Sequence, residues 1–341
     1  MAGTISVQSW SAEHEQDIDA FVAAHPDGLI YYTPAFRRYL LAVAGGRCQS
    51  RVAFDDGRVA GILPVLVKDG PFGPVLNSLP FFGSNGGVLA ASPAAESALM
   101  AEYDQLAAAA TVATWISHPF MDTTAPRHDL IDERIAQWTI LPADGSLPNE
   151  IEPSARRNIQ KAEAAGVSAR ETADALSFLE STHRDNMGAI GGRAKPAAFF
   201  SQLSTMTYGR DWRLHVAEHD GAPLAALLTF EAATTVEYVM PVVVDRARSL
   251  QPTALIIATA MAGAVARGFK RWNWGGTWLS QEGVYRFKKK WGASERRYRY
   301  FITLADESLR RRSAAELSSA YPWYFTLPYD RLAPTERHNG H

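Results

Sequence analysis

The stretch of sequence that most strongly suggests chemistry is WNWGGTWLSQEGVYRFKKKWG, residues 272–292. It overlaps a window, residues 282–299, that holds seven basic and two acidic side chains and so carries a net charge of +5. Such a concentration of positive charge predicts a site for the phosphates of a nucleotide, a coenzyme or an RNA end. Glycines after a strand let a ligand approach the backbone, and aromatic side chains can stack beside it. The residues concerned are Gly275, Gly276, Tyr285, Phe287, Lys288, Lys289 and Trp291.

The same stretch has a second interpretation, a solvated amphipathic helix whose Phe and Trp side chains face the core. Another candidate anion site is DRARSLQP, residues 245–252, between a predicted strand and an apolar helix. The free N–H groups and positive dipole end of a helix N-terminus suit pyrophosphate, and Arg246 and Arg248 would add charge-assisted hydrogen bonds. An ordinary strand-to-helix connection with exposed arginines is the alternative.

The sequence has no motif for an activated side-chain nucleophile or for a metal. HExxH and GxxxxGK[ST] do not occur, Ser84 and Ser280 lack a nucleophile-elbow context, and the single Cys48 rules out an internal disulfide or a cysteine cluster. His183 is the best acid–base candidate, although a structural histidine is the favoured interpretation. Direct transfer between two bound substrates, which needs positioning and stabilisation of an oxyanion, fits the sequence better.

Composition narrows the class of protein. The chain has 341 residues, 47% of them hydrophobic and 21% charged, which is typical of a globular protein with a sizeable core and predicts about two domains of roughly 150 residues. A net charge of −2 predicts no broad footprint on DNA or RNA. The N-terminus lacks a signal peptide, and no apolar stretch reaches the roughly 20 residues of a membrane span. We therefore expect a cytoplasmic protein, monomeric, with no tightly bound cofactor.

The elements needed to position the candidate residues follow from hydrophobic periodicity and turn signals. The first half predicts helices at 12–25, 34–44 and 92–110, a hairpin of 51–54 with 59–67, and a strand at 111–117. The second half predicts helices at 153–165, 175–186, 197–207 and 252–267, and strands at 213–218, 223–231, 235–244 and 270–274, the last pair parallel. This repeated order suggests a duplicated α/β (α+β) domain with mixed, largely antiparallel sheets flanked by helices.

Several of these segments resemble the FemAB-type acyltransferases, whose founding members are aminoacyl-tRNA-dependent peptidoglycan-bridge transferases. EPSARRNIQKAEAAGV, residues 152–167, resembles a family helix, and residues 178–203 resemble the helices that follow it. LHVAEHDGAPLAALLTF and the segments after it, residues 214–276, resemble the GNAT-like core, and GVYRFKKKWGA, residues 283–293, resembles the signature ending. LPFFGSNGGVLA, residues 79–90, resembles the glycine-bearing strand-loop of the first domain.

The resemblance implies two tandem GNAT-like domains, expected at 1–146 and 147–304, with residues 305–341 packing back on the first domain and ending in a flexible tail. It implies that Lys288 and Tyr238 are catalytic: Lys288 stabilises the donor's developing oxyanion or its phosphate, and Tyr238 lies beside the donor channel. Phe287, Gly275, Gly276, Arg246, Arg248 and Lys289 are expected to bind the donor, and Arg37 and Arg38 the acceptor. Arginine stands there where peptidoglycan-type members carry a substrate-binding lysine.

The implied activity is transfer of an acyl or aminoacyl group to the amine of a small molecule or peptide. Acyl-CoA and aminoacyl-tRNA, the latter contacted only at its acceptor end, remain alternative co-substrates. The segment RSLQPTA, residues 248–254, lacks the glycines of the usual GNAT pyrophosphate pattern, and no coiled-coil arm is present. A GNAT-like binding or scaffold protein without turnover is the second class of function.

Overall fold

The computed structural model describes residues 5–79, 86–122, 124–144, 146–329 and 332. Part of the LPFFGSNGGVLA segment, residues 80–85, therefore lies outside the described chain, and Ser84 with it. The chain folds into two compact units: unit 1 contains residues 1–25, 31–134 and 297–341, and unit 2 contains residues 26–30 and 135–296. The domain limits predicted from the sequence, at 146/147 and 304/305, stay predictions. The boundaries between the units at 134/135 and 296/297 fall within two long strands, β9 (Leu130–Ile140) and β15 (Ser294–Leu304).

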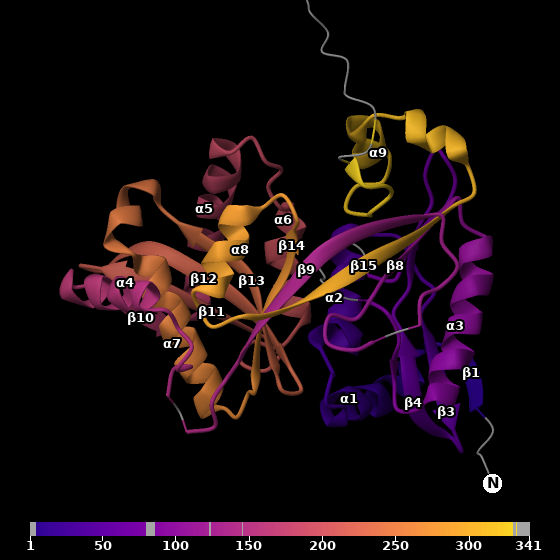
Figure 1. Ribbon diagram of the computed structural model, residues 1–341, viewed down its shortest axis with the longest axis horizontal. Helices are drawn as coiled ribbons and strands as arrows, with labels where there is room; N and C mark the ends of the chain where they lie inside the picture. Colours follow the sequence, from indigo (N-terminus) through magenta and orange to yellow (C-terminus); the bar gives the residue numbers. More distant parts are fainter. Residues whose placement is uncertain (1–4, 80–85, 123, 145, 330–331, 333–341) are drawn as a thin grey trace, which may run out of the picture. The chain divides into compact units, whose positions relative to one another are not determined.

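Unit 1 contains a sheet in which the strands follow the order β1-β3-β4-β7, and a second series in the order β15-β8-β6-β5-β2. Figure 1 labels β1, β3 and β4 of the sheet and β15 and β8 of the second series. Neighbouring strands are antiparallel except β6 and β8, which are parallel over Val75–Asn77 and Val112–Thr114. The elements are β1 (Ile5–Ser9), α1 (Glu15–Ala24), α2 (Pro34–Ala44), β2 (Arg47–Cys48), β3 (Arg51–Asp55), β4 (Arg58–Leu63), β5 (Leu66–Lys68), β6 (Val75–Asn77), β7 (Leu89–Ala90), α3 (Pro93–Ala108), β8 (Val112–Ile116) and α9 (Ala314–Ala320).

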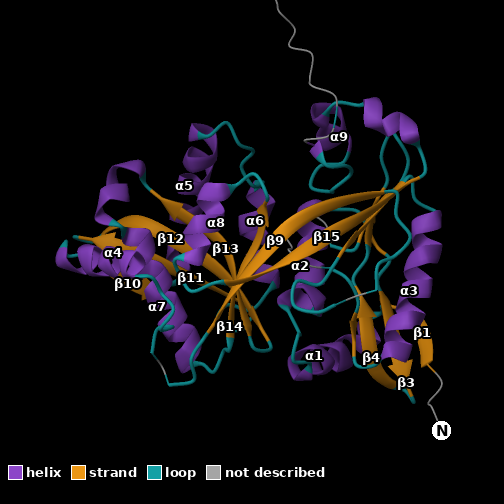
Figure 2. Ribbon diagram, in the orientation of Figure 1, coloured by secondary structure: helices purple, strands orange, loops and turns teal. Residues whose placement is uncertain are grey.

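Unit 2 is built on strands in the order β10-β11-β12-β13-β14. Helices α4 and α7 cover one face of these strands, and α5 and α6 cover the other (Figures 1 and 2). The elements are α4 (Pro153–Ala164), β10 (Ser168–Glu171), α5 (Leu176–Ala189), α6 (Ala197–Ser201), β11 (Trp212–His219), β12 (Ala222–Ala232), β13 (Thr235–Val243), α7 (Pro252–Ala266), β14 (Arg271–Trp278) and α8 (Glu282–Lys289). The α/β class with mixed, largely antiparallel sheets flanked by helices is thus confirmed.

Local chemistry explains why the elements of unit 2 begin and end where they do. The turn between β11 and β12 uses Asp220 and Gly221, both at positive φ, as a two-residue hairpin requires. Proline occupies the first turn of α4 and α7, where its missing N–H costs nothing. Gly166 and Gly268 follow α4 and α7 at positive φ of 75° and 87°, so both predicted helix stops are confirmed.

The α7 helix is apolar around almost its whole circumference because the sheet and α4 both cover it. It packs against β10, β11, β12 and β13 and also against α4, its neighbour on the same face of the sheet. Its Ile256, Ile257, Met261 and Ala264 are fully buried. These residues belong to one core with Trp272, Trp274 and Trp291. Such a core fixes the strand ends that carry the functional side chains.

The structure differs from the predicted elements at a few places. The helix expected at 197–207 is the short α6 followed by a 3-10 turn over Gln202–Thr205. The strand expected to stop before Gly275 continues through the two glycines to Trp278. A third of the basic window, residues 294–299, belongs to β15, in which Tyr298 and Tyr300 are buried while Arg297 and Arg299 are exposed. Alternation of this kind has a period of two and so belongs to a strand and not to a helix.

Candidate functional site

The candidate site of unit 2 lies where two parallel strands part. β13 and β14 pair from Thr235↔Arg271 to Glu237↔Asn273, and their pairing ends there although both strands continue. We call this point the fork. Beyond it, β13 keeps β12 as its partner up to Val243, and no strand of the described residues pairs with its other edge. An edge of this kind presents backbone groups to whatever fills the gap.

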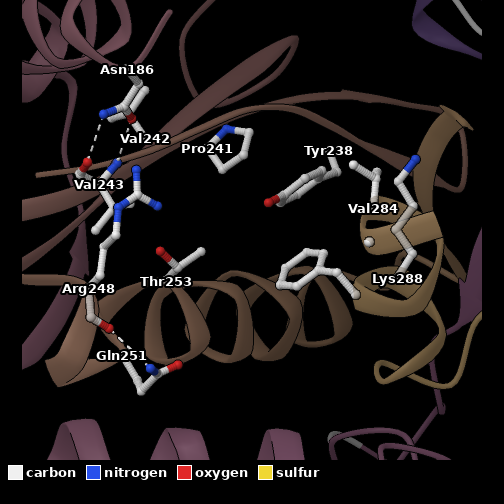
Figure 3. Close-up of a pocket in the computed structure, with 12 residues that line it drawn as sticks. Asn186, Tyr238, Pro241, Val242, Val243, Arg248, Gln251, Thr253, Val284 and Lys288 are labelled. Atoms are coloured by element: carbon white, nitrogen blue, oxygen red, sulfur yellow. Dashed lines mark hydrogen bonds between the residues drawn. The ribbon is translucent and has the colours of Figure 1, made fainter. Parts of the chain in front are cut away.

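A cavity of about 570 Å³ lies beside the fork (Figure 3). Its volume falls in the range of small-molecule and cofactor sites. The walls come from the end of β13, the start of α7, the exposed side of α8 and one residue of α5. They are formed by Asn186, Tyr238, Pro241, Val242, Val243, Arg248, Gln251, Thr253, Gly283, Val284, Phe287 and Lys288.

Two aromatic side chains form the middle of the cavity. Tyr238 leans on Trp274 with ring centroids 4.9 Å apart, and Phe287 meets the same indole edge-on at 6.1 Å. Their positions are therefore set by the buried tryptophan. The Tyr238 hydroxyl points along the cavity toward Thr253 (Figure 3). Burial raises the pKa of Tyr238 above its ordinary value of 10, so the phenol keeps its proton and can donate a hydrogen bond.

Lys288 is a buried amine at one end of the cavity, with 4% of its surface exposed. Its Nζ donates to Gly275 O and Gly276 O, both at 3.2 Å, and to Thr277 Oγ1 at 2.7 Å. Three acceptors match the three protons of an ammonium group. Burial lowers the pKa of Lys288 to about 7, so this cation titrates near neutral pH.

The opposite end of the cavity is the N-terminus of α7. Gln251 sits at the left-handed φ of 59° before Pro252, and its Nε2 donates to Arg248 O at 3.0 Å. Arg248 Nε bonds Asp245 Oδ1 at 2.9 Å on the surface. The first turn of α7 holds no acidic residue, so its positive dipole end faces the cavity uncompensated. This end of the cavity suits a group of negative charge.

Asn186 closes the far end of the β13 edge. Its Nδ2 donates to Val243 O at 2.9 Å and its Oδ1 accepts from Val243 N at 3.2 Å. The side-chain amide thereby takes the place that a neighbouring strand would have. Pro241, two residues before Val243 in β13, has no backbone N–H and cannot donate a hydrogen bond. Along the β13 edge that faces the cavity, the backbone groups of Val243 are therefore already hydrogen-bonded, and Pro241 has no N–H donor.

Comparison with known proteins assigns this region. Residues 153–289 match the Acetyltransferase (GNAT) domain family. The chain contains a GNAT acetyltransferase domain. All cavity residues named above fall inside its limits. No curated protein sequence matches the chain significantly.

Solved structures extend the likeness beyond the GNAT domain. The "Crystal structure of FemX" superposes with a TM-score of 0.68 at 15% identity and covers 87% of this chain and 97% of that one. A putative lysylphosphatidylglycerol synthetase C-terminal domain from Agrobacterium fabrum gives a TM-score of 0.58 at 10% identity, over 93% and 99%. L-PGS from Bacillus licheniformis gives 0.51 at 13%, over 84% and 95%. At these identities the likeness establishes a shared fold.

The GNAT domain brings four of the predicted site residues to the cavity: Tyr238, Arg248, Phe287 and Lys288. The other predicted donor-binding residues are placed elsewhere. Gly275 and Gly276 hold the Lys288 amine through their carbonyls, and Lys289 bonds Ala293 O at 3.0 Å and lies 3.4 Å from Glu295. Arg246 is exposed and outside the cavity lining. Donor binding by Gly275, Gly276, Lys289 and Arg246 stays a prediction.

The expected acceptor-binding pair, Arg37 and Arg38, belongs to α2 in unit 1. Both guanidinium groups bond the same carboxylate, Glu15, at 2.6 Å for Arg37. Arg37 also stacks over Trp10, 4.8 Å from the ring centroid. Their role toward an acceptor stays a prediction, and Glu15 offsets part of their charge.

The basic window does not form the concentrated anion site that its charge suggests. Of its seven cations, Lys288 alone lines the cavity. Arg286 pairs with Glu282, Lys289 with Glu295, and Arg297 and Arg299 share Glu133. The reason is the strand β15, which carries the later arginines away from α8. The positive groups at the cavity are instead Lys288, Arg248 and the start of α7.

His183 has the structural role that the sequence favours. Its Nε2 accepts a hydrogen bond from the Lys195 backbone N–H at 3.0 Å. Burial, and then the charge of Lys195, lower the pKa of His183, which keeps the ring neutral. Among the described residues no three His, Cys, Asp or Glu side chains group as a metal site would need, and no described helix is both long and apolar enough to span a membrane.

Sequence reasoning missed Asn186, Pro241, Thr253 and Val284 as cavity residues. Thr253 had a signal, since it follows the proline that opens α7. Asn186 had none, because α5 reaches the β13 edge only through the tertiary fold.

Proposed function

We propose that the protein is an N-acyltransferase that moves an acyl or aminoacyl group from an activated donor to the amine of a small molecule or peptide. The observation that carries the proposal is the cavity at the fork. It combines aromatic walls, a buried lysine at one end and an uncompensated helix N-terminus at the other, all within the GNAT domain. The donor's acyl group would lie near Lys288, and its phosphate near Arg248 and Thr253.

The reaction needs a neutral acceptor amine, which attacks the donor's carbonyl carbon. A C–N bond forms while the C–O or C–S bond to the donor's carrier breaks, and the amine's proton leaves to solvent or to the departing group. Negative charge builds on the carbonyl oxygen in between. The Tyr238 hydroxyl is the group placed to donate to it. Lys288 would contribute its positive charge, because its three protons are already held by protein acceptors.

The β13 edge favours an ester donor over a thioester. The pantetheine arm of coenzyme A is a chain with two amides, and an edge strand binds such a chain through its backbone groups. Here Asn186 occupies both groups of Val243, and Pro241 lacks a donor. An aminoacyl ester on the 3′ end of a tRNA has no amide arm, and its ribose and base suit the aromatic walls.

A donor assay tests the proposal. The protein is incubated with a panel of amines and either charged tRNA or acyl-CoA, and transfer of label to the amine is measured. We expect transfer from charged tRNA that ribonuclease abolishes. Transfer from acyl-CoA alone would overturn the preference for an ester donor but would still support an acyltransferase. If neither donor supports transfer to any amine of the panel, the proposal that the protein is an enzyme is contradicted.

One observation favours a second function, a binding protein without turnover. All three Nζ protons of Lys288 serve the protein itself, as those of a structural lysine do. Such a protein would be thermally stabilised by a donor fragment such as aminoacyl-adenosine and would transfer nothing. Thermal stabilisation by aminoacyl-adenosine, with no transfer to any amine of the panel, would support a binding protein without turnover.

A further inference from the structure

Glu237 is a buried carboxylate at the fork that the proposed reaction leaves without a role. It lies in β13 directly before Tyr238, with 2% of its surface exposed. Burying a carboxylate costs free energy unless hydrogen bonds satisfy it. Asn273, the residue opposite it in β14, donates from Nδ2 to Glu237 Oε2 at 2.8 Å. The pair stands at the last register position that the two strands share.

Asn273 bonds in a second direction along its own strand. Its Oδ1 accepts the backbone N–H of Gly275 at 3.0 Å, and the side chain has no exposed surface. Gly275 adopts a φ of 72°, a conformation that favours glycine. The amide thus holds β14 at a residue whose backbone adopts a left-handed conformation. The next two carbonyls, of Gly275 and Gly276, are those that hold the Lys288 amine.

The buried polar chain continues past Lys288. Thr277 Oγ1, which accepts from Lys288, donates to Gln137 Oε1 at 3.1 Å, and Gln137 Nε2 donates to Tyr285 O at 3.3 Å in α8. Thr277 and Gln137 are both fully buried. Connected buried polar groups of this kind fix one arrangement, because any other leaves a group unsatisfied. The Lys288 amine is therefore held by β14, and Gln137 of β9 connects Thr277 of β14 to the backbone of α8, the helix that carries the lysine.

We propose that Glu237 and Asn273 are positioning residues for Lys288. They act through Gly275: the carboxylate orients the Asn273 amide, the amide holds the Gly275 N–H, and the carbonyls that follow hold the ammonium at the cavity. The significance of Lys288 for transfer rests on the proposed function, whereas its placement by Glu237 and Asn273 is a property of the fold. The two can therefore be tested separately.

The test measures how fast the Lys288 amine reacts with trace acetic anhydride, read by mass spectrometry against Lys289 as an internal reference. Asn273→Ala removes both bonds, so we expect Lys288 labelling to rise by about threefold or more, because a buried hydrogen bond contributes to holding the amine. Glu237→Ala should act in the same direction. Glu237→Gln keeps an oxygen that accepts from Asn273, so it should stay near wild type.

The matched control is Asn77→Ala in unit 1, another fully buried asparagine whose amide bonds in both directions. It should leave Lys288 labelling unchanged. Asn273→Ser, whose hydroxyl is too short to bridge, replaces the alanine variant if that variant does not fold. Wild-type labelling in the Asn273 variant, or an equal rise in Asn77→Ala, would overturn the positioning role.

The transfer assay on the same variants separates this inference from the proposed function. Increased labelling with a lower kcat and an unchanged KM for the donor supports both. Increased labelling with wild-type transfer supports the positioning role of Glu237 and Asn273 but shows that Lys288 does not contribute to the reaction. Unchanged labelling overturns the positioning, whatever the activity.

Discussion

In each unit a helix lies in the chain between two parallel strands, and the space at the end of the first of these strands is filled differently. In unit 1, β6 and β8 are parallel and α3 precedes β8; in unit 2, β13 and β14 are parallel and α7 precedes β14. At the end of β6, Asn77 bonds the backbone N–H and C=O of Phe325, both at 2.8 Å. At the end of β13, Asn186 makes the same pair of bonds to Val243 beside an open cavity.

Unit 1 fills its space with its own C-terminal segment. Tyr321 Oη donates to Gly73 O at 2.7 Å and accepts from Phe72 N at 2.9 Å, and Tyr324 Oη donates to Gly45 O at 2.8 Å. A strand end covered by protein contributes stability, whereas one left open keeps room for a ligand. The difference teaches that similar local structure supports packing in one unit and, as proposed here, binding in the other.

The largest effect that we expect falls on stability in unit 1. Asn77→Ala leaves the N–H and C=O of Phe325 buried without partners, so it should lower the free energy of unfolding by ~2–4 kcal/mol. Urea denaturation measures this. The matched change in unit 2, Asn186→Ala, should cost ~1 kcal/mol or less because the half-buried site admits water. Equal losses would contradict the contrast between a filled and an open strand end.

The next effect compares Lys288 with Lys68, one lysine in each unit that donates to backbone carbonyls. Lys288→Ala should lower transfer by at least about tenfold with the fold retained, which corresponds to roughly 1.4 kcal/mol of lost transition-state stabilisation. Lys68 of unit 1, which donates to Ala44 O at 2.9 Å, provides the control. Transfer and circular dichroism are measured on both. Full activity of Lys288→Ala would remove this residue from the reaction.

The pH dependence sharpens the same comparison. Because burial lowers the pKa of Lys288 to about 7, its charge is present below that pH and is lost as the pH rises through it. The ratio of wild-type to Lys288→Ala activity should therefore decline between pH 6 and pH 8. Taking the ratio cancels the titration of the acceptor amine. A constant ratio would show that the charge of Lys288 is not what the reaction uses.

The smallest effect is expected at the start of α7. Arg248→Gln should raise the KM for the donor by a few-fold, on the order of 0.5–1 kcal/mol, because the side chain is exposed and shares its charge with Asp245. Arg246→Gln, outside the cavity lining, is the control. A larger effect of Arg246→Gln would place the donor outside the cavity.

Residue patterns alone predicted much of unit 2. Prolines in the first turn and the stops at Gly166 and Gly268 gave α4 and α7, and turn signals gave the β11–β12 hairpin. Resemblance brought Tyr238, Phe287 and Lys288 to attention, and the structure places all three at one cavity. These features are local, so short windows of sequence contain the information for them.

The remainder depended on the tertiary structure. The sequence shows a run of positive charge, but only the fold shows that Glu133, far earlier in the chain, pairs with Arg297 and Arg299. Nothing near Lys288 in sequence indicates that its amine faces the carbonyls of Gly275 and Gly276. Asn186 likewise meets Val243 only because α5 packs on β12 and β13.

The sequence by itself thus determined the elements and the residue types available for acyl transfer, since backbone propensity and side-chain chemistry are local properties. The tertiary structure decided which charges remain at the cavity, where the strand pairing ends and what holds the lysine. Burial and hydrogen-bond partners are set by residues distant in the chain, and they control both the pKa of a side chain and the space beside it.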